Sequence, residues 1–152
     1  MPEVIISDTS CLLVLHNTSH LFLLRDLFGT VLTTGVVAAE FNRPLPEWVV
    51  IVDPVDTGRY EQLRSIVDAG EASAIALALE HPASKLILDD MKGRALATDL
   101  GLAHTGTIGI LKAAKNKGYI PLIGPLLTRM RAADFWISDA LEDAVLKEAG
   151  ER

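Results

Sequence analysis

The sequence predicts an α/β fold in which helices cover both faces of a central parallel sheet, as a three-layer α/β/α sandwich. Short apolar runs rich in Val, Ile and Leu alternate with helical segments along the chain, and this order is typical of parallel strands joined by crossover helices. Hydrophobic residues make up 49% of the sequence but aromatic residues only 5%, so aliphatic side chains must form the core. The length of 152 residues predicts a single domain spanning 1–152.

The predicted elements follow from short-range patterns. Strands are expected at residues 4–8, 30–33, 48–52, 85–89 and 102–105. Helices are expected at residues 10–16, 20–28, 35–41, 57–68, 71–80, 91–100, 108–117, 121–130 and 139–149. Gly29 and Gly118 follow two of these helices, where glycine commonly ends a helix, and Pro44 limits a third. We expect Ala69-Gly70 to separate helix 57–68 from the next one.

Composition and charge exclude several classes of protein. The formal net charge of -6 argues against a protein held on nucleic acid mainly by overall positive charge. Cys11 is the single cysteine; it cannot form an internal disulfide and is expected in the core. The four histidines show no zinc-ligand spacing. We expect no secretory signal and no membrane span, and therefore a cytoplasmic protein.

Acidic residues stand where parallel strands end. Asp8 follows the first strand, and the pair Asp89-Asp90 follows the fourth. Because parallel strands share one direction, these ends lie at the same edge of the sheet, where α/β proteins bind ligands. Glu71 opens a helix expected to begin or end near that edge, and Glu40 lies late in a helix of small residues. The pattern predicts one acidic cluster.

Each acid also has a purely local explanation. Asp8 and Asp90 can cap the helices that follow them. Glu71 at a helix start is stabilised by the helix dipole, and Glu40 can be ordinary surface charge. Each local explanation alone is at least as good as the functional one, but convergence of all four on one edge favours a site.

A cluster of carboxylates predicts a particular chemistry. Like charges close together share protons or bind a cation, and carboxylates without His or Cys partners favour Mg²⁺ or Mn²⁺. Such ions activate water and stabilise displacement at phosphorus, which points to phosphodiester hydrolysis. The expected metal ligands are Asp8, Glu71 and Asp90. Side chains alternate along a strand, so Asp89 is expected to support Asp90 or to act through water.

Hydroxyl and basic side chains flank these acids. Thr9 and Ser10 are expected to orient Asp8. Thr107 is expected to do the same or to contact phosphate from a helix start, with simple helix capping as the alternative. A local basic rim for a polyanion is expected from side chains that could equally be solvated helix faces: Lys92, Arg94 and Lys112, with Lys115 and Lys117 nearby.

Five segments taken in order resemble the PIN-domain family nearly end to end. They are Ser7-Asp8-Thr9-Ser10, residues 36–41 around Glu40, residues 70–78 from Gly70-Glu71, residues 88–95 around Asp89-Asp90, and residues 106–111 from Gly106-Thr107. The similarity is greatest to a prokaryotic PIN-like subgroup related to VapC-type toxins, and Phe135-Trp136-Ile137-Ser138-Asp139 in the tail also resembles that subgroup.

The resemblance implies a PIN-like sandwich with an acidic cleft that binds Mg²⁺ or Mn²⁺ and hydrolyses RNA. The matching catalytic positions are Asp8, Glu40, Glu71 and Asp90. Such proteins are often toxins neutralised by an antitoxin, and homodimers are common among them. Two departures are visible: Glu71 stands where many PIN domains carry Asp, and Cys11 stands where the subgroup usually has Pro.

The leading hypothesis is therefore a metal-dependent endoribonuclease. The alternative is a non-catalytic PIN-like module that binds RNA or a protein. A phosphoryl-accepting domain with Asp8 as nucleophile ranks last, because the first strand lacks an acidic pair and the late strand carries His104 in place of Lys.

Overall fold

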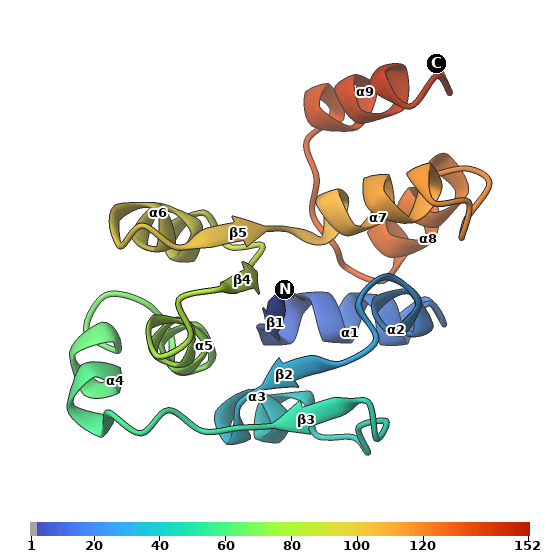
Figure 1. Cartoon of the computed structure of the whole chain (residues 1–152). Helices are drawn as coiled ribbons and strands as arrows, with labels where there is room; N and C mark the ends of the chain where they lie inside the picture. The colour runs from blue at the N-terminus through green and yellow to red at the C-terminus, as the bar shows by residue number, and fades with distance from the viewer. Residues whose placement is uncertain (1–2) are drawn as a thin grey trace.

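Five parallel strands form the centre of the computed structural model, which describes residues 3–152. They are β1 (Val4–Ser7), β2 (Val31–Thr33), β3 (Val49–Ile51), β4 (Ser84–Ile87) and β5 (Ala103–Thr105). The strand order is β3-β2-β1-β4-β5, with β1 in the middle (Figure 1). The α/β fold class is thus confirmed; residues 1 and 2 of the expected domain lie outside the described residues.

Nine helices are present in the described part of the chain, and they connect and cover the strands. They are α1 (Thr9–Asn17), α2 (Phe22–Phe28), α3 (Gly35–Phe41), α4 (Thr57–Leu63), α5 (Ala69–Leu79), α6 (Met91–Asp99), α7 (Thr107–Asn116), α8 (Gly124–Ala132) and α9 (Asp139–Glu148). Across residues 3–152, no helix is both long and apolar enough to cross a membrane.

The alternation of side chains along the strands builds two separate cores. Ile5 packs with apolar side chains of α1, α2, α3, α7, α8 and α9, whereas its neighbour Ile6 packs with those of α4, α5 and α6. Successive strand residues point to opposite faces of a sheet, so each face buries its own layer of helices. Figure 1 shows α4, α5 and α6 gathered on one side of the strands. This is the predicted three-layer sandwich.

Several helix boundaries differ from the expectation. The expected helix 57–68 ends at Leu63, and Gly70, expected to break the pattern, lies inside α5. The reason is that the Asp68 side chain accepts a hydrogen bond from the Glu71 amide and starts α5 earlier. The expected helix 121–130 begins only at Gly124, whose amide is bound by the side chain of Glu151.

The strand register aligns the carboxyl ends of β1 and β4. Ser7 pairs with Ile87, and the Asp8 amide continues the ladder by donating to the Ile87 carbonyl at 3.1 Å. From β2, the Thr33 hydroxyl donates to the Ser7 carbonyl at 2.9 Å. Asp8 therefore starts from a backbone that is fixed on both sides.

Candidate active site

Asp8 is buried at the carboxyl end of the central strand, with 5% of its surface exposed. It occupies the cap position of α1, but its side chain makes no capping hydrogen bond, and its buried Oδ1 has no hydrogen-bond partner among the described residues. Burial raises the pKa of the Asp8 carboxyl to about 7; the Thr9 amide opposes this rise, and the charges of Asp68, Glu40 and Asp89 add to it. Helix capping does not explain this carboxylate.

The side chains of Glu40 and Asp8 both lie against Gly70. The Thr9 hydroxyl donates to Glu40 Oε1 at 2.6 Å, so the support expected for Asp8 from this threonine goes to Glu40. Gly70 brings α5 against both acids: a β-carbon there would overlap Glu40 Oε1 and would lie 3.1 Å from Asp8 Oδ1. Glycine therefore allows this approach without displacing the Glu40 side chain. The exposed Ser10 instead lines a cavity together with the Asp89-Asp90 pair.

Glu71 is buried at the start of α5, with 3% of its surface exposed. Burial is the main reason that the pKa of its carboxyl rises to about 8; the charge of Asp68, a hydrogen bond with Asp90 and the charge of Asp8 also contribute. Gly93 of α6 packs on this side chain, 3.4 Å from Glu71 Cδ to the place of its missing β-carbon. Glu71 is thus affected by the charges of both Asp8 and Asp90.

The two adjacent aspartates have different partners. Asp89 Oδ1 accepts from the Thr107 amide at 2.7 Å, and Oδ2 accepts from the Thr107 hydroxyl at 2.6 Å. Asp90 is exposed and caps α6 by accepting from the Lys92 amide at 2.9 Å, and it lies close enough to Glu71 to help raise the pKa of that carboxyl. Thr107 therefore holds Asp89 and not Asp8, and it does so from the first turn of α7, where an anion is also stabilised by the helix dipole.

The carboxylates of this edge are suitable ligands for a hard divalent cation, but they are not yet arranged around one point. The unpartnered Oδ1 of Asp8 and the raised pKa values of Asp8 and Glu71 are what carboxylates show when no cation balances their charge. Among residues 3–152, however, no three acidic, His or Cys side chains already converge as a metal-holding group. Glu40, Asp89 and Asp90 each bond elsewhere, so ion binding requires side-chain rearrangement.

Two cavities open beside the acidic pair. One has a volume of about 680 Å³ and the other about 510 Å³, and both are lined by Asp89 and Asp90 together with Phe135 and Trp136. The larger is also lined by the predicted basic residues Arg94 and Lys112.

The predicted basic residues have mixed surroundings. Arg94 Nη1 donates to the Leu88 carbonyl at 3.1 Å, and Lys112 forms an ion pair with Glu148 at 3.1 Å. Lys92 is exposed at the start of α6 and lies outside the described lining of both cavities. The structure therefore brings Arg94 and Lys112 to the acidic edge and leaves Lys92 on the surface.

The sequence reasoning missed Asp68. Its carboxylate caps α5 and adds negative charge next to Asp8 and Glu71. The signal was the spacing Asp68-Ala-Gly-Glu71, which is that of a capping box; it was missed because Asp68 was assigned to the end of the preceding helix.

Comparison with known proteins gives a family match over nearly the whole chain. A family model described as the PIN domain matches residues 4–151. No curated protein matches the chain significantly.

Proposed function

The chain belongs to the PIN domain family, and from this premise we propose that it is a metal-dependent endoribonuclease that hydrolyses RNA phosphodiester bonds. PIN domains have a nuclease-type fold and typically use divalent metals. The observation that carries the proposal is the buried, unpartnered Oδ1 of Asp8 at the end of the central strand. A buried carboxylate without a partner is costly, and the cost is explained if the oxygen binds a cation.

The proposed ligands of Mg²⁺ or Mn²⁺ are Asp8, Glu71 and Asp90. Asp89, which accepts two hydrogen bonds from Thr107, is proposed as a support or a water-mediated ligand. When bound, such an ion lowers the pKa of a water molecule and stabilises the charge that develops on the phosphoryl oxygens. Asp68 adds negative charge that attracts the cation without needing to touch it.

Glu40 is the proposed proton acceptor. Its Oε1 accepts from Thr9, which orients the carboxylate and leaves Oε2 to take a proton from the attacking water. Glu40 is exposed, so it is accessible to water. Arg94 and Lys112 line the adjoining cavity and are proposed to contact substrate phosphates.

The substitution Asp8→Asn tests the proposal. It keeps the shape of the side chain and removes the charge, so we expect Mn²⁺-dependent cleavage of single-stranded RNA to fall by at least about 100-fold while the melting temperature stays the same or rises. Asp99→Asn is the matched control, because Asp99 is exposed at the far end of α6 and should retain full activity. Equal cleavage by wild type and Asp8→Asn would refute the assignment.

A non-catalytic PIN-like module that binds RNA or a protein is the competing proposal. The raised pKa of two buried acids argues against it, because a binding module has no reason to keep mutually repelling carboxylates. Calorimetry with Mn²⁺ separates the two: binding heat lost in Asp8→Asn supports the nuclease, and absence of heat in the wild type supports the module. An antitoxin partner follows from the family resemblance alone and is tested by co-expression with the neighbouring reading frame.

A further inference from the structure

The connector between α8 and α9, residues 133–138, has a fixed backbone but exposes one large side chain, Trp136, to solvent. The Phe135 amide donates to the Met130 carbonyl at 3.0 Å, and Ile137 is buried with 2% of its surface exposed. Trp136, between them, has 82% of its surface exposed. Its exposure is therefore a consequence of how its neighbours are fixed, and not of a loose segment.

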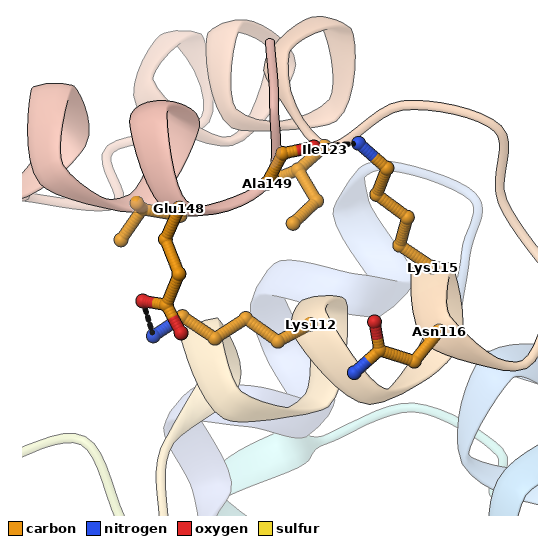
Figure 2. A pocket seen from close by; sticks show the side chains of 7 residues that line it. Lys112, Lys115, Asn116, Ile123, Glu148 and Ala149 are labelled. Atoms are coloured by element: carbon orange, nitrogen blue, oxygen red, sulfur yellow. Dashed lines mark hydrogen bonds and ion pairs between the residues drawn. The ribbon is translucent and has the colours of Figure 1, made fainter. Parts of the chain in front are cut away.

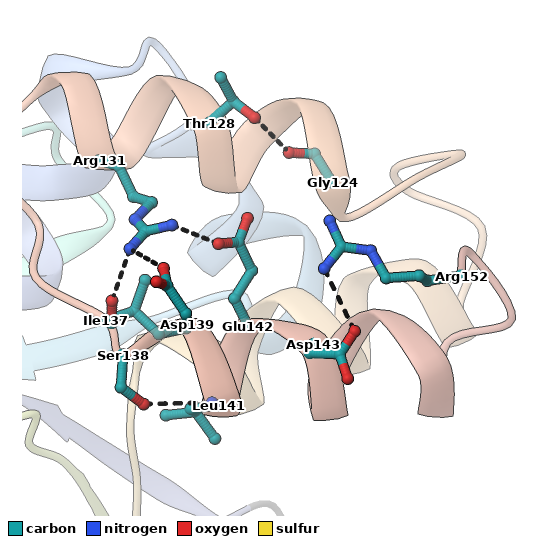
Figure 3. A network of polar contacts seen from close by, with 10 residues as sticks. All are labelled: Gly124, Thr128, Arg131, Ile137, Ser138, Asp139, Leu141, Glu142, Asp143 and Arg152. Atoms are coloured by element: carbon teal, nitrogen blue, oxygen red, sulfur yellow. Dashed lines mark hydrogen bonds and ion pairs between the residues drawn. The ribbon is translucent and has the colours of Figure 1, made fainter.

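A polar network reinforces this arrangement (Figure 3). Arg131 of α8 reaches across to the connector and to α9: its Nη2 donates to the Ile137 carbonyl at 2.9 Å and to Asp139 Oδ1 at 3.1 Å. Its Nη1 donates to Glu142. These bonds fix the start of α9 next to α8, so the position of the Trp136 backbone is set before any ligand arrives.

Trp136 stands beside the proposed catalytic edge. The two cavities that flank the Asp89-Asp90 pair are both lined by Trp136, so this residue borders both of them. Arg94 and Lys112 line the larger of the two. An exposed aromatic face next to cations is the combination that binds single-stranded nucleic acid, in which bases stack on the ring and phosphates contact the cations.

We propose that Trp136 is a stacking platform for a nucleobase of single-stranded RNA, in the groove that leads from Asp89-Asp90 past Arg94 and Lys112. This inference rests on the proposed ribonuclease function and specifies its substrate as an unpaired strand. The stacked base adds affinity without hydrogen-bond readout, so the platform tolerates any base. It positions the strand while the acids act on the backbone.

An RNA strand fits this groove better than a protein does. Met91 and Leu141 also line it and are exposed, which by itself would suit an apolar protein surface. The groove is, however, continuous with the acidic edge and carries two cations, and a polyanion with apolar base faces complements both features. A protein occupant is retained as an outcome of the test.

Fluorescence provides a direct test, because the chain has only two tryptophans. In Trp48→Phe, the emission of Trp136 is observed alone. We expect a 12-nucleotide oligouridine, added in EDTA to prevent cleavage, to quench this emission, and an abasic 12-mer with the same sugar–phosphate chain to leave it unchanged. Absence of quenching by oligouridine, or equal quenching by both oligomers, would overturn the stacking assignment.

Substitution gives the second test. Trp136→Ala should weaken oligouridine binding and raise KM by about 5- to 150-fold, with kcat nearly unchanged, whereas Trp136→Phe should retain most of the affinity. Both variants should keep the wild-type melting temperature, because the side chain is exposed. Unchanged Kd and KM in Trp136→Ala would overturn the proposal, and dissociation of a dimer by this variant with unchanged RNA binding would assign the surface to a protein. Mn²⁺ binding and cleavage measured on the wild type report separately on the nuclease proposal itself.

Discussion

At the level of one residue, Asp8 is a buried carboxylate that destabilises the metal-free fold at a position where it can serve function. Its amide is bonded to β4 and the carbonyl of the preceding Ser7 accepts from Thr33 of β2, while its side chain has an unpartnered, buried oxygen. Glu71 is also buried, with its charge opposed by three other acids. Both carboxyl groups favour the protonated form near neutral pH, so the metal-free protein and the unfolded chain bind different numbers of protons.

Stability of the metal-free protein should therefore fall as pH rises from 5 to 8.5. The folded-state pKa values of Asp8 and Glu71 are about 7 and about 8, against about 4 in the unfolded chain. Because both values are raised, the stabilising contribution is complete below about pH 4 and is lost as pH rises through 7 and 8. We expect a loss of about 6 kcal/mol in the free energy of unfolding if both carboxyl groups titrate as these values indicate, measured with urea in EDTA.

The same groups predict how the pH dependence can be reduced. Asp8→Asn should make the loss of stability with rising pH smaller, because only Glu71 then titrates with a strongly raised pKa. Mn²⁺ should restore stability at pH 8.5 more than at pH 5, because metal and protons compete for the same oxygens. A wild-type stability that is flat or rises over this pH range would contradict the raised pKa values.

At the level of elements, the first turn of α5 combines several functions. Asp68 caps it, Gly70 lets it approach Asp8 and Glu40, and Glu71 enters the acidic edge from it. The rest of α5 is buried along most of its length, and most of its buried residues are small. The packing of α5 on the sheet therefore also brings Asp68, Gly70 and Glu71 to the acidic edge.

Gly70→Ala should separate these functions. Alanine is the better helix former by up to about 1 kcal/mol, but its β-carbon would displace Glu40, which is exposed and able to move, and would press on Asp8. We expect a folded protein whose RNA cleavage is reduced by about 10- to 100-fold, the range typical of disturbed metal-site surroundings.

Gly58→Ala in α4 is the matched control, since a β-carbon there meets only Asp56 Oδ1 at an ordinary 3.5 Å. It should gain about 0.5–1 kcal/mol of stability and keep full cleavage activity. Unimpaired cleavage by Gly70→Ala would show that the close approach of α5 is dispensable.

How far the sequence predicts this arrangement depends on the range of the interaction. The strand ends at Asp8 and Asp89-Asp90 were predictable, because parallel strands necessarily share an edge. The bonds of Thr9 to Glu40 and of Thr107 to Asp89 were not, because they depend on the side-by-side placement of elements distant in sequence. Gly70 was misread as a helix breaker because glycine disfavours helices locally, whereas the reason for it here is tertiary contact.

At the level of the whole molecule, the end of the chain is tied to the helical layer on one face of the sheet. Glu151 accepts from the amides of Ile123 and Gly124 and from Lys115 Nζ, each at 2.8 Å. These bonds join the segment after α9 to the start of α8 and to α7. Figure 2 shows the neighbouring pair, Lys112 with Glu148, and the contact of Lys115 with Ala149. The tail therefore supports α7, which carries Lys112, and α8, from which the connector with Trp136 leads on.

The two glutamates of this region should contribute unequally to stability. Glu151 has 7% of its side chain exposed and Glu148 has 70%. Burial raises the pKa of the Glu151 carboxyl, but its hydrogen bonds from Ile123, Lys115 and Gly124 outweigh burial and leave the pKa below its ordinary value. Since a depressed pKa stabilises the fold at neutral pH and this contribution is lost as pH falls through the folded-state pKa, Glu151→Gln should lose about 2 kcal/mol at pH 7 and less at pH 4.

Glu148→Gln should change the free energy of unfolding by no more than about 0.5 kcal/mol, as is usual for exposed ion pairs. Urea unfolding of both variants at pH 7 and pH 4 measures the difference. Equal effects of the two substitutions would mean that the tail is held by its apolar contacts and not by Glu151. If Glu151 holds it, Glu151→Gln should also weaken oligouridine binding, because loosening α9 releases the connector that positions Trp136.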